Sequence, residues 1–288
     1  MEFKNKGPKQ EYFHCYATAN DSRIYLKDIQ NLMRLKNNYS GFSKIVLLIA
    51  ISEVNNISFF DKFFVKNVNN IFHNHPFIEL REVYFKGNIG RDFSSYQTLL
   101  NKVKKTANDD DFILFQNRSG YGPFQENWYK KFVTQFEKFD SIAICGSTIN
   151  FNDHPLRSLS NNVPHIQTYS FLTKVHYMKM LGDIFPGSNQ AERLNIICDG
   201  EIELSQFFLR KKHKITCIEW PDEEISNQTS PISLLDIKAK VVAKHYFYHR
   251  KYFRKHTQII PDIINFLSFL YQGLKKNKTG AKKNPLAN

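Results

Sequence analysis

Short apolar runs alternate with helix-like stretches along the first 145 residues of this chain. The runs predict strands at residues 12–18, 44–52, 80–85, 111–116 and 141–145, and the intervening stretches predict helices at 26–35, 59–72, 93–103 and 126–139. Because parallel strands need crossover helices, this alternation predicts an α/β fold with a mostly parallel central sheet flanked by helices. Ligands of such sheets bind beyond the carboxyl ends of the strands, so the residues after each strand form the candidate site.

Length and composition limit the class of protein. With 288 residues, 42% of them hydrophobic, the chain has ample material for one packed domain, which we place at residues 10–225. The longest apolar run, residues 45–51, is far shorter than the roughly 20 residues of a membrane-spanning helix. Residues 1–10 lack the apolar core of a secretory signal, so we expect a cytoplasmic location.

The positive charge is concentrated near the C-terminus. The formal net charge of the whole chain is +13. Residues 238–288 contain 12 Lys and Arg against one acid, Asp262, whereas the rest of the chain has 28 basic and 26 acidic groups. The chain is therefore a near-neutral body followed, over residues 226–288, by a basic, aromatic segment that we predict to be helical.

The basic segment allows three interpretations. Residues 245–256 interleave basic and aromatic side chains, and residues 259–274 carry apolar residues at spacings that a helix gathers on one face. This combination over residues 238–283 favours attachment to an anionic membrane, where each Lys or Arg contributes on the order of 1 kcal/mol. The alternatives are a helix packed on the body with a solvated charge run, and a segment that binds nucleic acid.

Two strand ends carry residues suited to an activated sugar. In Lys86-Gly-Asn-Ile-Gly-Arg-Asp92, two glycines allow close backbone approach and Arg91 offers a forked donor to phosphate. In Asn117-Arg-Ser-Gly-Tyr-Gly-Pro-Phe124, small polar groups and rings follow an apolar strand, as in many sugar sites. Each stretch is also typical of an ordinary turn capped by Asp or Asn.

These two stretches resemble segments of the bacterial rhamnan-synthesis and related polysaccharide glycosyltransferases, which have a GT-A-like nucleotide-sugar fold. The resemblance continues in residues 165–171, similar to the family's His-x-Gln-Ser-Tyr-Phe segment, and in residues 199–206, similar to its acidic stretch at the start of a late helix. It covers residues 84–220 and implies a GT-A-like domain over residues 10–225.

The resemblance also implies where a nucleotide-sugar donor, linked to UDP or dTDP, would bind. The end of the first strand, residues 17–21, would border the base and ribose. The donor-binding residues that it implies are Ala17, Asn20, Asn88, Gly90, Arg91, Asp92, Asn117 and Ser119.

Asn117 and Ser119 stand where many enzymes of this fold place a metal-binding pair of aspartates. An amide and a hydroxyl bring no charge to a cation, so the sequence does not support a divalent metal. Either Arg91 and helix amides stabilise the departing diphosphate without metal, or a nearby carboxylate such as Asp92 substitutes. We favour the first interpretation.

Transfer with inversion needs a base that removes the proton of the acceptor hydroxyl. The resemblance makes Glu201 the first candidate and His165 the second. Contacts to the acceptor or sugar are expected from Tyr121, Gln167, Tyr169, Asp199 and Glu203. Strand alternation would place His165, Gln167 and Tyr169 on one face. The alternative interpretation is that the acids are helix N-terminal charges and that His165 is structural.

The predicted function is transfer of a hexose or deoxyhexose from a nucleotide sugar to a lipid-linked or lipid A-core glycan of a bacterial surface polysaccharide. The enzyme would lie peripherally on the anionic inner face of the cytoplasmic membrane and would bind no nucleic acid. Inversion is expected, and retention by a front-face mechanism is its alternative. The alternative function is a non-catalytic nucleic-acid-binding module that uses the basic segment.

Overall fold

The computed structural model describes residues 10–22, 24–240, 242–253 and 258–274. The strands are β1 (Tyr12–Ala19), β2 (Ile45–Glu53), β3 (Ile78–Gly87), β4 (Phe112–Asn117), β5 (Gly120–Tyr121), β6 (Ile142–Gly146), β7 (Ile149–Asn150), β8 (His165–Ile166), β9 (Ser170–Lys174), β10 (Lys214–Cys217), β11 (Glu224–Ile225) and β12 (Tyr248–His249). The helices are α1 (Leu26–Asn37), α2 (Phe59–Phe72), α3 (Arg91–Val103), α4 (Trp128–Phe136), α5 (Val175–Met180), α6 (Arg193–Ile196), the π-helix η1 (Ile197–Ile202), α7 (Glu203–Arg210), α8 (Pro231–Ala239) and α9 (Ile259–Leu274).

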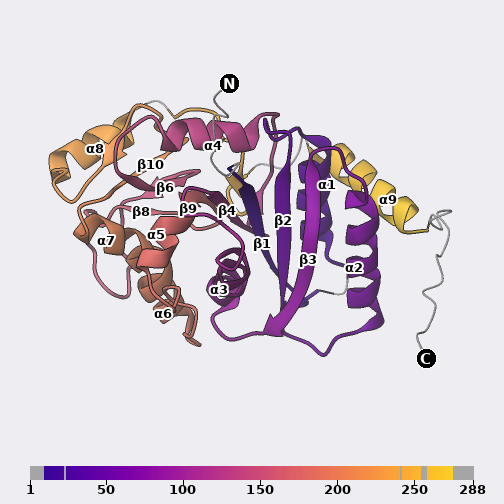
Figure 1. Ribbon diagram of the computed structural model, residues 1–288. Coiled ribbons are helices and arrows are strands. Elements are labelled where there is room, and N and C mark those ends of the chain that lie inside the picture. The colour runs from indigo at the N-terminus through magenta and orange to yellow at the C-terminus, as the bar shows by residue number, and fades with distance from the viewer. Residues whose placement is uncertain (1–9, 23, 241, 254–257, 275–288) are drawn as a thin grey trace, which may run out of the picture.

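The central sheet has the strand order β11-β10-β6-β9-β4-β1-β2-β3. β1 pairs in parallel with β2 and β4, β2 pairs in parallel with β3, and β6 pairs in parallel with β10. β9 and β11 are antiparallel to their neighbours. Helices lie around the sheet in Figure 1. The predicted α/β fold, with a mostly parallel central sheet flanked by helices, is therefore confirmed.

The helices α1 and α3 cover opposite faces of the sheet. The hydroxyl of Tyr16 in β1 donates to Asp28 of α1 at 2.9 Å. Cys15, the preceding residue, is level with Phe115 of β4, whose ring lies 5.0 Å from that of Tyr96 in α3. Neighbouring residues of a strand point to opposite faces, so the two helices sandwich the strands that end at the candidate site.

The structure corrects one predicted strand. Of residues 165–169, only His165 and Ile166 form a strand, β8, and a turn follows at Thr168 and Tyr169. The strand that enters the sheet between β4 and β6 is β9, which begins at Ser170. Strand alternation therefore does not set the directions of Gln167 and Tyr169.

Residues 242–253, which the sequence assigned to the basic segment, are packed into the body. β12 pairs with β5, and the backbone N–H of Ala243 donates to the carbonyl of Glu219 at 2.8 Å. Phe247 is fully buried. The predicted boundary at residue 225 is therefore not an edge of the packed body.

The helix α9 lies along α1 and α2 (Figure 1). Its Asp262 pairs with Arg34 of α1 at 2.8 Å, and its Phe269 is buried with a ring 6.0 Å from that of Phe64 in α2. Within the described residues, no helix has the length and apolar character needed to cross a membrane. Residues 241, 254–257 and 275–288 of the predicted basic segment lie outside the described residues.

Candidate functional site

The strands β1, β2 and β4 end together at the carboxyl edge of the sheet. Ala17 of β1 is level with Ala50 of β2 and with Asn117 of β4. Ala17 itself is fully buried two residues before its strand ends. The residues that follow these strands therefore share one edge of the sheet, as the alternation in the sequence predicted.

Asn20 joins the loops that follow β1 and β2. Its side-chain oxygen accepts from the backbone N–H groups of Val54 and Asn55 at 2.7 and 2.9 Å, and its amide donates to the carbonyl of Asn55 at 2.6 Å. Both ends of the buried side chain are thus engaged. The side chain of Asn20 therefore fixes the two loops relative to each other.

A cavity of about 600 Å³ opens beside these loops. Its lining residues follow β1 and β2 and begin α2, and they are Asn20, Asp21, Ser22, Asn55, Asn56, Ser58, Phe59, Phe60 and Asp61. Phe59 is 74% exposed and Phe60 is 49% exposed, so the polar wall faces two accessible rings. The volume and this mixture of rings and polar groups suit a small-molecule ligand.

The turn after β3 has a backbone that needs glycine at its centre. Gly90 has φ 68°, and a β-carbon there would overlap the backbone carbonyl of Ser188. Its N–H donates to the carbonyl of Gln190 at 3.0 Å, which ties the turn to the 187–190 loop. Asn88 and Arg91 are exposed beside it. Among the described residues, the guanidinium of Arg91 has no hydrogen-bond or ion-pair partner, which leaves it available to an anion.

The side chain of Asn117 is engaged at both ends. Its amide donates to Oδ2 of Asp92 at 2.8 Å, and its oxygen accepts from the backbone N–H groups of Ser119 and Gly120 at 2.9 and 3.3 Å. Burial raises the pKa of Asp92 to about 6, against the lowering effects of Arg118 and Asn117. The strand end and the first turn of α3 are therefore joined by one polar contact.

These residues do not fit a resident divalent cation. A cation would need the oxygen of Asn117, which already accepts from two backbone N–H groups. Among the described residues, no group of three or more His, Cys, Asp or Glu side chains is placed to hold a metal ion.

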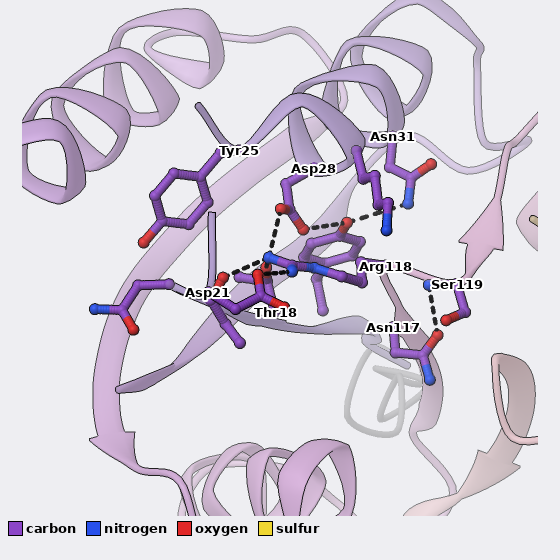
Figure 2. A network of polar contacts seen from close by, with 12 residues as sticks. Thr18, Asp21, Tyr25, Asp28, Asn31, Asn117, Arg118 and Ser119 are labelled. Carbon is purple, nitrogen blue, oxygen red and sulfur yellow. Dashed lines mark hydrogen bonds and ion pairs between the residues drawn. The ribbon is translucent and has the colours of Figure 1, made fainter. Parts of the chain in front are cut away.

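Arg118 is a site residue that the sequence did not reveal. Its guanidinium, 14% exposed, pairs with Asp21 and with Oδ2 of Asp28, the latter at 2.9 Å, and donates to Thr18 Oγ1 at 2.8 Å. Figure 2 shows it lying between the two carboxylates, with Asn117 and Ser119 beside it. Burial alone would lower its pKa, but Asp28 and Asp21 raise it overall. Arg118 therefore holds a positive charge at the end of β1, next to the 600 Å³ cavity.

Asp28, which pairs with Arg118, belongs to a buried polar network. Asp28 also accepts from the hydroxyl of Tyr16, and Asn31 donates to that hydroxyl at 3.1 Å. Nη2 of Arg250, from the C-terminal segment, donates to Asn31 Oδ1 at 2.9 Å. The charged edge of the sheet is thus connected to residues more than 200 positions later in the chain.

Glu201 is oriented by two neighbours and remains 23% exposed. Its Oε1 accepts from the amide of Gln167 and its Oε2 from the hydroxyl of Thr168, both at 2.9 Å. The next residue, Tyr169, accepts at its carbonyl from the backbone N–H of Asn117 at 3.2 Å. The segment 167–169 therefore lies between Glu201 and Asn117, and brings the two predicted site residues to one edge.

His165 is buried beside Glu201. Its Nε2 lies 3.8 Å from Oε1 of Glu201, and its Nδ1 lies 2.7 Å from the carbonyl oxygen of Val163. Burial lowers the pKa of His165, although Glu201 acts in the opposite direction. A buried, neutral imidazole suits a positioning role next to the partly exposed Glu201.

The two other acids of this segment point elsewhere. Asp199 accepts from the amide of Gln190 at 3.1 Å, and Glu203 pairs with the exposed Arg210 on the far side of α7. The stretch that begins at residue 199 enters the fold as the π-helix η1, and α7 starts only at Glu203. π-Helical turns are frequent at functional sites, but this sequence carried no sign of one.

Tyr121 is not placed to contact a sugar. It is fully buried, and its hydroxyl donates to Oδ2 of Asp262 in α9 at 2.5 Å. It anchors α9, because Asp262 also pairs with Arg34. Ser119, by contrast, lies half-buried in the turn after β4 beside Arg118 (Figure 2).

No family model matches this chain, and no curated protein matches it. The predicted membership in the rhamnan-synthesis family therefore stays a prediction. Among solved structures, the chain is similar to the apo bifunctional glycosyltransferase WbbM, with a TM-score of 0.46 and 11% identity over 92% of this chain and 52% of that one.

Mouse xyloside xylosyltransferase 1 in its apo form has a TM-score of 0.45 and 10% identity, over 84% of this chain and 98% of its own. The galactosyltransferase LgtC, in complex with donor and acceptor sugar analogs, has a TM-score of 0.42 and 10% identity, over 91% and 95%. These are distant similarities, and they assign no substrate and no residue role to this chain.

Proposed function

We propose that this protein is a glycosyltransferase that moves a sugar from a UDP- or dTDP-linked donor to a bacterial surface glycan. The observation that carries the proposal is the carboxyl edge of the sheet. A polar cavity with exposed rings follows β1 and β2, Arg91 follows β3 and has no partner among the described residues, and Glu201 is an oriented carboxylate held by the segment 167–169. Open α/β sheets bind their ligands at such an edge.

The donor would lie across the ends of β1, β2 and β3. Its base would occupy the 600 Å³ cavity against Phe59 and Phe60, and its ribose hydroxyls would bond to Asp21. Its diphosphate would lie toward Asn88, Arg91 and Ser119, where a guanidinium without another partner can bind two phosphate oxygens.

Glu201 would act as the base for inversion. A carboxylate held by two donors keeps one orientation, and its partial exposure lets an acceptor hydroxyl reach it. His165 would pack against the buried side of Glu201 without a hydrogen bond to it, and would not itself remove the proton. Retention remains the alternative, and the anomeric configuration of the product, read by proton NMR, distinguishes the two.

The experiment that tests the donor site is a thermal-shift screen of UDP, dTDP, GDP and CMP sugars, with and without Mn²⁺. A ligand that binds only the folded state raises the melting temperature. We expect a UDP or dTDP sugar to stabilise the wild type without Mn²⁺, and the Arg91→Ala variant to lose most of that shift. A screen in which no nucleotide sugar stabilises the protein would refute the proposal.

We further propose that α9 attaches the enzyme to an anionic membrane that carries the acceptor lipid. Its side away from the body presents large apolar residues at helical spacing, each more than half exposed, namely Ile260, Ile263, Ile264, Leu267 and Tyr271. Three lysines follow in the sequence at positions 275, 276 and 278. An apolar face next to positive charge favours an anionic bilayer surface.

Co-sedimentation with phosphatidylglycerol-containing vesicles tests this attachment. The double substitution Ile263→Ser with Leu267→Ser should release the protein, because it removes apolar area from the bound face. The matched control is Ile232→Ser with Leu235→Ser on α8, where both residues are also more than half exposed. Equal binding by both double variants would contradict a role for α9.

The nucleic-acid alternative gains no support from the described part of the basic segment. Arg250 is buried within the body, and Lys240 pairs with Glu223. The buried Arg250 is therefore not available to a phosphate backbone, whereas Lys244 and Lys251 are exposed. Binding of RNA or DNA that falls steeply with salt would favour the alternative.

A further inference from the structure

A second cavity, of about 490 Å³, is lined by Gln167, whose amide donates to Glu201. It is enclosed by the residues that follow β6 and β10, by the turn before β9, and by residues 245–253. The side chains that matter here are Gln167, Glu219, His245, Tyr248, His249 and Tyr252. Five of the eleven lining residues come from the segment that the sequence assigned to a basic surface.

Rings form most of the wall. The ring of His245 stacks on that of Tyr248, with centroids 4.9 Å apart and planes 10° from parallel. His249 lies 5.1 Å from Tyr252 and 5.5 Å from Tyr169. Tyr252 is 74% exposed at the rim, with the ammonium group of Lys251 5.4 Å from its ring centroid. Aromatic faces of this kind pack on the C–H face of a sugar ring.

Polar groups stand among these rings. Glu219 accepts from the hydroxyl of Thr148 and lies with its other oxygen 3.7 Å from Nε2 of His245. Nδ1 of His245 is buried and has no hydrogen-bond partner among the described residues. The carboxylate of Glu219 is a suitable partner for ligand hydroxyl groups.

The charge of the cavity selects the kind of sugar. Glu219 lines it and Glu201 lies just beyond Gln167. Burial lowers the pKa of His249, which keeps that ring neutral near pH 7. Among the described residues that line the cavity there is no Lys or Arg, and the ammonium group of Lys251 lies outside it, 5.4 Å from the ring centroid of Tyr252. An uncharged sugar is therefore favoured over a phosphate, a nucleotide or an acidic sugar.

Gln167 connects this cavity to the proposed base. It lines the cavity, and its amide donates to Glu201 at 2.9 Å. Only the side chain of Gln167 would therefore separate a sugar in the cavity from Glu201, the proposed base.

We infer that this cavity binds a neutral pyranose of the acceptor glycan, with Tyr252 as the stacking platform and Glu219 as a hydroxyl acceptor. The inference rests on the proposed glycosyltransferase function. It assigns the acceptor site to the C-terminal segment, and it names the ligand as an uncharged sugar.

The test is saturation-transfer NMR of the full chain with methyl glycosides of glucose, galactose, rhamnose and N-acetylglucosamine. At least one glycoside should bind the wild type. Tyr252→Ala should weaken that binding about fivefold to tenfold, the effect of losing one stacking ring, and Tyr252→Phe should restore it. Tyr39→Ala removes a partly exposed tyrosine that does not line the cavity and should bind as the wild type does.

A thermal shift with the nucleotide sugar, measured on the same four proteins, separates the two proposals. It should be equal in all of them, because Tyr252 does not line the donor cavity. The inference is overturned if no glycoside binds, if Tyr252→Ala binds like the wild type, or if the nucleotide sugar displaces the glycoside. Glycoside binding without any nucleotide-sugar shift would refute the glycosyltransferase proposal and leave a sugar-binding cavity.

Discussion

Nε of Arg250 donates to the backbone carbonyl of Arg118 at 3.2 Å, so a buried arginine from the C-terminal segment supports the arginine at the end of β4. The same guanidinium donates to Gln30 Oε1 at 2.6 Å and to Asn31 Oδ1 at 2.9 Å, and it lies over the ring of Tyr121. At least one positive charge of the C-terminal segment, that of Arg250, therefore stabilises the fold.

Arg250→Lys should therefore destabilise the fold. A lysine cannot reproduce the planar fork, and several buried acceptors would lose their donor, at a cost of about 2–3 kcal/mol. The matched control is Arg210→Lys, whose exposed pair with Glu203 should contribute less than about 1 kcal/mol. Urea unfolding measures both, and equal stabilities would show that residues 242–253 are not docked as described.

Glu201→Gln should lower turnover by about 10²- to 10⁴-fold, the usual contribution of a general base. The amide keeps the shape of the side chain, so the melting temperature and the nucleotide-sugar shift should stay close to those of the wild type. Glu203→Gln is the control, because Glu203 lies two residues away and pairs with Arg210. Near wild-type turnover of Glu201→Gln would exclude it as the base.

Gly90→Ala and Gly182→Ala separate backbone strain from steric overlap. Both glycines have positive φ, at 68° and 75°, but a β-carbon meets Ser188 at Gly90 and open space at Gly182. We expect Gly182→Ala to cost about 1 kcal/mol and Gly90→Ala about 2–5 kcal/mol, because overlap adds to strain. Denaturant unfolding gives both free-energy changes. Similar losses of stability in the two variants would mean that the 187–190 loop does not contact the turn at Gly90 closely.

Donor binding should depend on pH through Asp92. Burial raises the pKa of Asp92 to about 6, more than Arg118, Asn117, Lys86 and Arg91 together lower it. Below about pH 6 the neutral carboxyl no longer repels the diphosphate, so a nucleotide sugar should bind several-fold more tightly at pH 5.5 than at pH 7.5. Asp92→Asn should remove this dependence in a calorimetric titration.

The same pKa has a consequence for folding. The raised pKa means that Asp92 of the folded chain stays protonated as the pH rises from 3.8, the ordinary pKa of the group, toward 6. In the unfolded chain Asp92 loses its proton over the same range. The wild type should therefore lose stability relative to Asp92→Asn across that window. A constant difference between the two proteins would show that Asp92 titrates normally.

Much of the fold could be predicted because its patterns are local. β2 is buried along residues 45–52, so it appears as a continuous apolar run, and the crossover helices follow from the parallel strands. The positions of Asn117 and Glu201 at one edge also followed from the order of strands and the family resemblance.

The remaining features depend on contacts between distant residues. Arg118 reaches Asp28, 90 positions away, and nothing in its local sequence indicates that pairing. Tyr121 was expected at a sugar but is buried against Asp262. One signal for this contact was present in the sequence. Asp262 is the single acid among the twelve basic residues of 238–288, and it lies on an apolar helix, where a buried carboxylate needs a partner.

Phe59 and Phe60 line the donor cavity and also a neighbouring apolar groove of about 360 Å³, which includes Phe266, Phe269 and Leu270 of α9. Any occupant of the groove therefore constrains the rotamers of rings that the nucleotide base would touch. Such coupling is reciprocal by thermodynamic necessity. If a lipid chain entered the groove beside α9, it would change the affinity of the protein for the nucleotide. The nucleotide would change the affinity for the lipid by the same factor.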